Sequence, residues 1–294
     1  MARQLPTTPR PVPQTIVYKT VDALDIPLDL YLPDHAKNVP ILLWPPQPPP
    51  PHLLAAVPKH NIALISADYR LAPQASLPTI YSDVESCITF IRTRLASHLA
   101  QNAVDPTRLA VSGSSAGGYL ALLAGLRLDP KPQVILPIYP ITDPLGTFFT
   151  TPQPHPVPGS GPTDPTPLAP FLDPNAQAVA NNSPASARGQ MYFYMMQEAN
   201  LASLLHLTSA TADEWRVAKS ISKCGLPPTY IVHGDADRAV GVEQADEVVG
   251  VMVGVGVEVV YERLRGLDHL FDHKAEFEME GMYEFMLKHL WGGG

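Results

Sequence analysis

The sequence predicts an α/β fold with a mostly parallel central sheet, flanking helices and an inserted cap. Three observations support this prediction. Short apolar runs alternate with helical patterns through most of the 294 residues, as they do in proteins built from βαβ units. One of these runs ends in a turn of small residues, Gly113-Ser114-Ser115-Ala116-Gly117, and a helix follows it. One long segment, residues 143–226, interrupts the alternation.

Composition and charge exclude several classes of protein. A net charge of −8 argues against nucleic acid or an anionic membrane surface as the main partner. No run of about 18 apolar residues occurs, so we expect no transmembrane helix. Residues 1–10 contain no apolar signal region, and Cys87 and Cys224 are the two cysteines. We therefore expect a cytoplasmic protein without disulfides, whose oligomeric state the sequence does not predict.

The N-terminal part of the chain is predicted to begin with a loose arm, which strands and helices follow. Residues 1–14 are rich in proline and are expected to form a loose arm. The segment 26–32 alternates apolar and polar residues, which is typical of a half-exposed antiparallel strand. We expect strands at 15–20, 26–32, 40–44 and 61–69 and helices at 52–59 and 78–99.

The remaining elements continue the alternation on either side of the interruption. We expect strands at 108–113, 133–139, 229–233 and 257–264 and helices at 119–125, 242–253 and 274–291. The predicted core therefore comprises residues 15–142 and 227–294, and residues 143–226 form the predicted cap. Ligand sites in parallel sheets lie at the carboxyl ends of the strands, which is where Ser115 is expected.

The predicted cap has two parts of different composition. Residues 151–174 are dense in proline and are expected to form a long irregular loop. Residues 191–196 and 201–207 carry methionine, aromatic and leucine side chains, which predicts two short helices. Most such apolar stripes are ordinary packing, but some of these side chains should line an apolar substrate pocket. The candidates for substrate binding are Ser114, Met191, Phe193 and Tyr194.

The turn at Ser115 fits the pattern G-x-S-x-G between a buried strand and a helix. This pattern favours a sharp turn that holds the serine on strained backbone with its hydroxyl exposed. The start of the following helix favours negative charge that develops beside the serine. A nucleophilic serine needs a base and a group that orients the base. Asp237 and His269 each follow a predicted strand, so both are expected at the same edge of the sheet as Ser115.

Four segments, in the order in which they occur along the chain, resemble segments of the α/β-hydrolases. The resemblance is narrower to the hormone-sensitive-lipase-like carboxylesterases of the fold-3 type. Tyr69-Arg70-Leu71-Ala72-Pro73 is similar to a Y-R-L-A-P segment of that group, and Gly113 to Gly117 to its nucleophile turn. His233 to Val240 resembles its H-G-x-x-D-x-x-V segment, and Gly266 to Phe271 its histidine loop. The resemblance spans about residues 15–291. It implies carboxylesterase or lipase activity, an apolar acyl pocket under a cap, and no cofactor.

The resemblance also implies a role for each residue of the candidate triad. Ser115 is the nucleophile, His269 the base, and Asp237 the acid, because the second carboxylate of the segment matches the pattern. Asp235 is then a turn residue, and His233 a histidine at a strand end. His273 lies close to Asp272 and Glu276, but H-E-x-x-H is absent and a solvated helix start explains this run. No metal site is therefore predicted.

The chain departs from the family at the segment that supplies oxyanion donors. Members carry H-G-G-G after an early strand, whereas this chain has Pro45-Pro46-Gln47-Pro48-Pro49-Pro50-Pro51 there. Proline has no N–H group, so Gln47 is the one backbone donor of that run. The candidate oxyanion donors are the N–H of Ala116 and Gln47, and losing one donor typically costs about 10²–10³ in turnover.

Several interpretations of the proline run remain open. In the first interpretation, the protein is a serine hydrolase of small carboxylic esters in which Gln47 or the region of His52 replaces the missing donor. Alternatively, it is a weakened hydrolase, or a small-molecule-binding protein on a hydrolase fold. A third interpretation is an error in the gene model, and a fourth makes the prolines polyproline II ligands of partner domains. Lactonase, amidase and acyl-transfer activities use the same nucleophile and also remain open.

Overall fold

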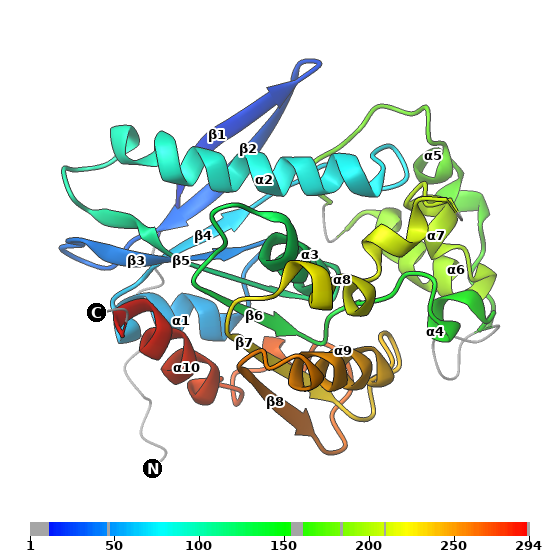
Figure 1. The fold of residues 1–294 in the computed structure, drawn as a ribbon. Helices are drawn as coiled ribbons and strands as arrows, with labels where there is room; N and C mark the ends of the chain where they lie inside the picture. The colour runs from blue at the N-terminus through cyan, green and yellow to red at the C-terminus, as the bar shows by residue number, and fades with distance from the viewer. Residues whose placement is uncertain (1–11, 46–47, 154–160, 183–184, 209, 293–294) are drawn as a thin grey trace, which may run out of the picture.

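In the described part of the chain, eight strands form one sheet in the order β1-β2-β4-β3-β5-β6-β7-β8 (Figure 1). The computed structural model describes residues 12–45, 48–153, 161–182, 185–208 and 210–292, so nearly all of the predicted arm lies outside them. From β4 onward the neighbouring strands are parallel, and β1 and β2 add an antiparallel edge. The predicted fold class is confirmed. The strands are β1 Gln14–Val21, β2 Leu24–Tyr31, β3 Val39–Trp44, β4 Ala63–Ala67, β5 Val104–Ser114, β6 Val134–Ile138, β7 Thr229–Gly234 and β8 Val259–Leu264.

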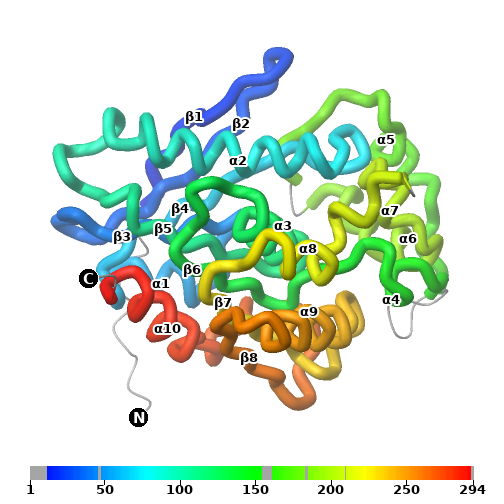
Figure 2. The backbone as a smooth tube through the Cα atoms, in the orientation of Figure 1, coloured from blue at the N-terminus to red at the C-terminus, as the bar shows by residue number. Residues whose placement is uncertain are grey.

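The longer helices cover the sheet, and the short ones gather at one end of the molecule. Figures 1 and 2 show α4 to α7 together at the right, beyond the sheet. No helix within the described ranges is long and apolar enough to cross a bilayer. The helices are α1 Pro51–His60, α2 Leu77–Thr93, α3 Ala116–Arg127, α4 Thr147–Thr150, α5 Ala169–Leu172, α6 Met191–Glu198, α7 Leu201–Leu204, α8 Val217–Cys224, α9 Glu243–Gly254 and α10 Glu280–Trp291.

The two faces of the sheet pack against different helices. In β3, Ile41 and Leu43 belong to the core cluster that contains α2, α3, α8 and α9. Leu42 and Trp44 belong to the opposite cluster, which contains α1 and α10. Successive side chains of a strand point to opposite faces, so the continuous apolar run of β3 serves both layers. Each large apolar side chain buried in this way contributes about 1.5–3 kcal/mol.

Several predicted elements differ from the structure, among them the helix predicted at 201–207, which ends at Leu204. Helix α2 ends at Thr93 because Arg94 leaves helical geometry at φ −128°, and a 3-10 turn follows. Helix α10 begins at Glu280 rather than at 274, because Met279 before it has the left-handed φ of 57°. The predicted irregular loop 151–174 contains a 3-10 turn and α5, with proline in the first turn of each, a position that tolerates the missing N–H group.

A buried carboxylate ties α2 to the antiparallel edge of the sheet. Asp83 is fully buried and accepts hydrogen bonds from Arg70 and from Lys19, which lies in β1. Burial alone would raise the pKa of Asp83, but the bonds from Arg70 and Lys19 bring that pKa below its ordinary value. Arg70 belongs to the Y-R-L-A-P segment, so the ion pairs also fix the loop that follows β4.

Replacing Asp83 by asparagine should destabilise the fold, because the change leaves two cationic groups without their shared anion. We expect a loss of about 3–5 kcal/mol in unfolding free energy at pH 7, measured by urea denaturation. The contribution of the carboxylate is present above its unfolded pKa of about 4 and is lost as the pH falls. Asp83→Asn should therefore be less sensitive to acid than the wild type. Asp213→Asn removes an exposed ion pair and serves as the control, and equal losses in both variants would contradict this account.

Candidate active site

The turn between β5 and α3 holds Ser115 in a strained conformation. Its φ and ψ are 53° and −117°, a combination that few residues other than glycine adopt. A Cβ atom on Gly113 would lie 2.3 Å from the backbone of Gly117, so that position requires glycine. The N–H of Ser115 donates to the carbonyl of Ile138 at 2.9 Å, which fixes the turn against the end of β6.

Asp237 and His269 meet at the same edge of the sheet, on the loops that follow β7 and β8. The Nδ1 atom of His269 lies 2.7 Å from Oδ2 of Asp237. The two loops approach so closely that a Cβ atom on Gly234 would lie 2.2 Å from the carbonyl oxygen of Leu267. An ion pair between Arg238 and Asp268 also joins them. The fold therefore brings together the acid and the base that the sequence predicted.

The surroundings of Asp237 keep its carboxylate charged. Burial would raise its pKa, but hydrogen bonds from His233 and His269 and the N–H of Val240 hold that pKa well below the usual range. The N–H groups of Ala239 and Val240 both donate to Oδ1 at 2.8 Å. An ionised carboxylate only accepts hydrogen bonds, so Nδ1 of His269 carries the proton. The Nε2 atom of His269 is then left with a lone pair that can act as a base.

The other acidic and histidine candidates near this site have structural partners. The carboxylate of Asp235 accepts a hydrogen bond from the N–H of Gly266 at 2.6 Å, which holds the loop after β8. His233 is fully buried, and its Nε2 lies 2.9 Å from the carbonyl oxygen of Val240. His233 therefore lies beneath Asp237 and supports its loop.

The candidate oxyanion donors differ in what the structure shows of them. Ala116 is the first residue of α3, and the first N–H groups of a helix have no acceptor within it. Its N–H is thus available beside Ser115. Gln47 lies outside the described residues. His52, the other candidate region, is buried, with Nδ1 2.7 Å from the hydroxyl of Tyr283 and Nε2 3.8 Å from Asp272.

Tyr139 and Asp272 form a buried contact behind His269 that sequence reasoning missed. Asp272 is fully buried and accepts a hydrogen bond from the hydroxyl of Tyr139, so a solvated helix start is wrong for this residue. The ring centroid of Tyr139 lies 4.2 Å from that of His269. Tyr139 also has a positive φ of 33°. Its place at the carboxyl end of β6 was the available signal, since site residues gather there.

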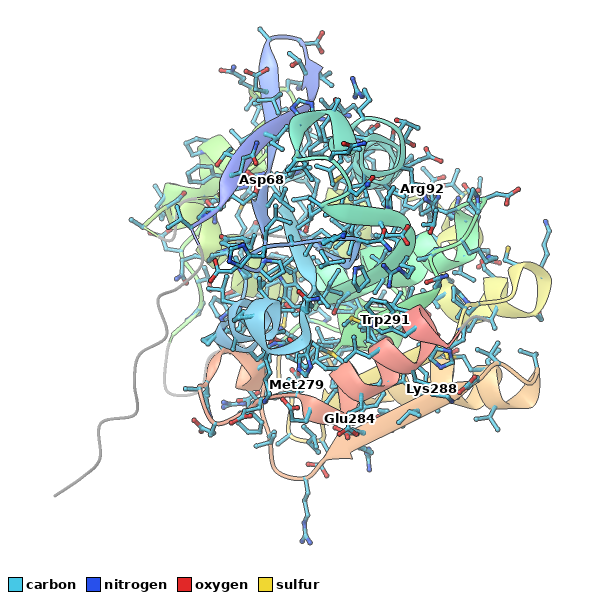
Figure 3. All side chains as sticks on the ribbon, turned by 90° about the vertical axis from the view of Figure 1, so that its left-hand side faces the viewer. Asp68, Arg92, Met279, Glu284, Lys288 and Trp291 are labelled. Atoms are coloured by element: carbon cyan, nitrogen blue, oxygen red, sulfur yellow. The ribbon has the colours of Figure 1, made fainter. Side chains whose placement is uncertain are left out.

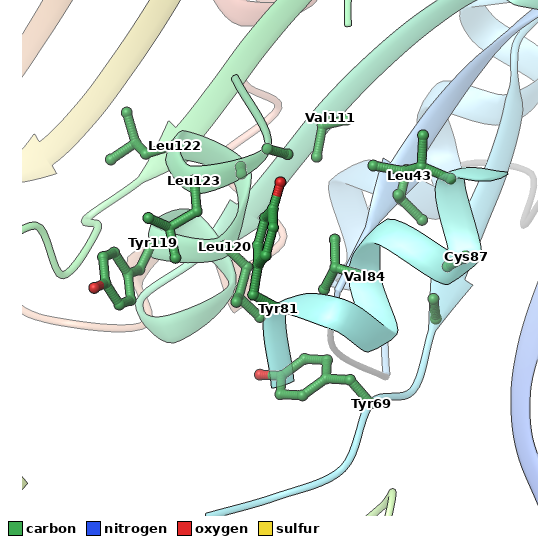
Figure 4. Close-up of a cluster of buried hydrophobic side chains, with 14 of the residues drawn as sticks. Leu43, Tyr69, Tyr81, Val84, Cys87, Val111, Tyr119, Leu120, Leu122 and Leu123 are labelled. Atoms are coloured by element: carbon green, nitrogen blue, oxygen red, sulfur yellow. The ribbon is translucent and has the colours of Figure 1, made fainter. Parts of the chain in front are cut away.

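A cavity of about 330 Å³ begins at Ala116, next to Ser115. Its walls are mostly apolar and include Met191, one of the four side chains predicted to bind substrate. Ser114, Phe193 and Tyr194 are not among its lining residues, whereas Tyr192 is. The hydroxyl of Tyr192 donates to the carbonyl of Ala239, which links α6 to the loop of Asp237. Figure 4 shows Tyr69, Tyr119 and Leu120, which form part of the cavity wall.

Comparison with known proteins identifies the family. A family model described as an alpha/beta hydrolase fold matches residues 50–273, which is most of the chain. The protein belongs to this α/β-hydrolase family. The match begins at residue 50 and so leaves out β1 to β3 and nearly all of the proline run. The resemblance that the sequence motifs indicated is confirmed at the level of the family.

Named relatives of this hydrolase include carboxylesterases and much larger enzymes. It is 27% identical over 190 residues to a probable carboxylesterase, clz11, of Cochliobolus lunatus, covering 60% of this chain and 85% of the relative. It is 26% identical over 275 residues to the non-reducing polyketide synthase adrD of Penicillium rubens, covering 77% of this chain but only 11% of that protein. A thermophilic esterase of Thermogutta terrifontis shares the fold with a TM-score of 0.64 and 19% identity, over 97% and 94% of the two chains. The protein is a carboxylesterase-like hydrolase.

Removing the hydroxyl of Tyr139 tests the buried contact behind His269. Tyr139→Phe keeps the ring but takes the donor away from buried Asp272, which should cost about 1–3 kcal/mol in unfolding free energy. Tyr230→Phe is the matched control, because its hydroxyl bonds to Glu262 on the exposed edge strand, where water can replace it. Urea denaturation should show the larger loss for Tyr139→Phe. A loss no larger than that of the control would show that water reaches Asp272.

Proposed function

We propose that the protein is a serine hydrolase that cleaves small carboxylic esters with the triad Ser115, His269 and Asp237. The observation that carries this proposal is the 2.7 Å contact between His269 and Asp237 at the edge of the sheet where Ser115 follows β5. The carboxylesterase names of the relatives support the substrate class. The apolar cavity beside Ala116 is the proposed acyl site, and residues 143–226, which supply part of its wall, are the proposed cap.

The proposed reaction proceeds through an acyl-enzyme. Ser115 Oγ attacks the ester carbonyl while Nε2 of His269 accepts the serine proton, and Asp237 stabilises the resulting imidazolium. The N–H of Ala116, at the start of α3, donates to the oxyanion. The tetrahedral intermediate then expels the alcohol, which takes its proton from His269. Water, activated by His269, attacks the acyl-enzyme by the same steps and releases the carboxylic acid.

The proline run defines the alternative function. Pro45, Pro48, Pro49 and Pro50 have no N–H to donate, and the side chain of His52 is buried with its Nδ1 beside the hydroxyl of Tyr283. Neither the prolines nor His52 supports a second oxyanion donor. A hydrolase with one donor keeps the triad and should turn over about 10²–10³-fold more slowly than one with two donors. The alternative function is that of a protein that binds esters without cleaving them, and it applies if the triad gives no turnover.

A chain-length series of 4-nitrophenyl esters tests the proposed activity. A cavity of about 330 Å³ is at the small end of the range for ligand pockets, so kcat/KM should peak at short or medium acyl chains. Ser115→Ala should lower turnover by a factor on the order of 10⁶ for a working triad. Turnover by Ser115→Ala equal to that of the wild type would overturn the proposal.

Two neighbouring aspartates separate a role in catalysis from a role in folding. Asp237→Asn removes the charge that orients His269 and should lower kcat by about 10⁴ with little change in KM. Asp235→Asn is the control, because that carboxylate holds the N–H of Gly266 and not the imidazole. Its kcat should stay within a few-fold of the wild type. Equal losses in the two variants would show that the loop, and not the triad, limits the rate.

A further inference from the structure

Arg188 is the one buried side chain among the described lysines and arginines, with 9% of the residue exposed. It lies in the 3-10 turn Ala187–Gln190 directly before α6. Its Nη2 donates to the carbonyl oxygen of Ala72 at 2.5 Å and to the side-chain oxygen of Gln74 at 2.8 Å. Both acceptors are neutral, and no ion pair among the described residues includes Arg188.

Two other arginines of this chain that lie partly out of water have an anionic partner, whereas Arg92 and Arg127 bond only to carbonyl oxygens. Arg70 pairs with Asp83 at 2.7 Å, and Arg216 pairs with Asp143 at 2.6 Å. A buried charge without an opposite charge is costly. Burial accordingly lowers the pKa of Arg188 below its ordinary value. A negatively charged ligand would supply the partner that the protein itself does not.

Arg188 lines the same cavity as Ala116. Its Nε and Nη1 groups form no hydrogen bond with any described residue. The hydroxyl of Tyr69 and the side chain of Asn182, which also line the cavity, are likewise without a hydrogen bond among these residues. Within the described residues, three polar side chains that line an otherwise apolar space thus have unused hydrogen-bonding capacity, and a purely aliphatic chain would leave all of them unsatisfied.

We propose that this cavity selects esters whose bound portion ends in a carboxylate, and that Arg188 is the residue that recognises this group. The apolar wall holds the hydrocarbon between the scissile carbonyl and the carboxylate. Tyr69 and Asn182 add hydrogen bonds to the carboxylate or to its neighbouring atoms. Water adds across the ester bond, so the products are a dicarboxylate and an alcohol. This inference rests on the proposed function and names the substrate class of that site.

Matched pairs of substrates test the selectivity. One member is a 4-nitrophenyl half-ester of adipic or pimelic acid, and in the other a carboxamide replaces the distal carboxylate. We expect the wild type to prefer the charged member by about tenfold or more in kcat/KM, because a charge-assisted bidentate pair is stronger than a neutral one. Arg188→Met should lower this preference by about 10–100-fold, mainly through KM, and Arg188→Lys should restore part of it.

The ratio of the two rates within one variant cancels general damage to the fold. Arg92→Met is the control, because Arg92 on α2 (Figure 3) also bonds only to carbonyl oxygens, those of Pro130 and Lys131, and does not line the cavity. Its ratio should equal that of the wild type. A wild type that treats both members alike, or an Arg188→Met variant with an unchanged ratio, would overturn the inference.

Binding without turnover separates this inference from the proposed function. Calorimetry with adipate and the Ser115→Ala protein measures the anion site alone. Binding that disappears in the Ser115→Ala, Arg188→Met double variant supports the inference even where no ester is cleaved. Turnover of neutral aryl esters without any binding of adipate would overturn the inference and leave the esterase proposal intact.

Discussion

The hydrogen bond between Asp237 and His269 joins two loops that lie 32 residues apart in the sequence. Parallel strands bring both loops to one edge of the sheet, and the glycine at the end of β7 lets the second loop lie against the first. The low pKa of Asp237 follows from this crowding, since the buried His233, the partly exposed His269 and backbone N–H groups converge on one carboxylate. The orientation of the base, and hence any nucleophilic role for Ser115, depends on this contact.

Buried polar groups in this fold fall into two kinds. Asp83 and Asp237 are satisfied several times over by neighbouring donors. Asp272 has one donor, Tyr139, and Arg188 has no anionic partner within the described residues. Groups of the first kind fix loops and helices, because removing one hydrogen-bond partner would leave a buried charged group without compensation for its lost hydration. Groups of the second kind lie behind the candidate base or along the cavity wall. A ligand there can form the hydrogen bonds and the ion pair that the described protein groups do not form.

The sheet, the sharp turn at Ser115 and the meeting of Asp237 with His269 at one edge of the sheet could be predicted from the sequence, because each depends on local signals. Apolar runs give the strands, and Gly113, Asp237 and His269 lie at fixed distances from strand ends. The wall of the cavity could not be predicted in the same way. Arg188 and Tyr69 come from segments far apart in the chain, and their meeting depends on how the short helices pack. Asp272 looked solvated because nothing nearby in the sequence shows that Tyr139 covers it.

Covalent labelling by a fluorophosphonate probe tests the central claim most directly, because it reports the nucleophile without assuming a substrate. The account predicts a single adduct that peptide mapping places on Ser115, and slower labelling of Asp237→Asn. It also predicts no adduct at this position in Ser115→Ala. Folded wild-type protein that remains unlabelled at Ser115 would contradict the account.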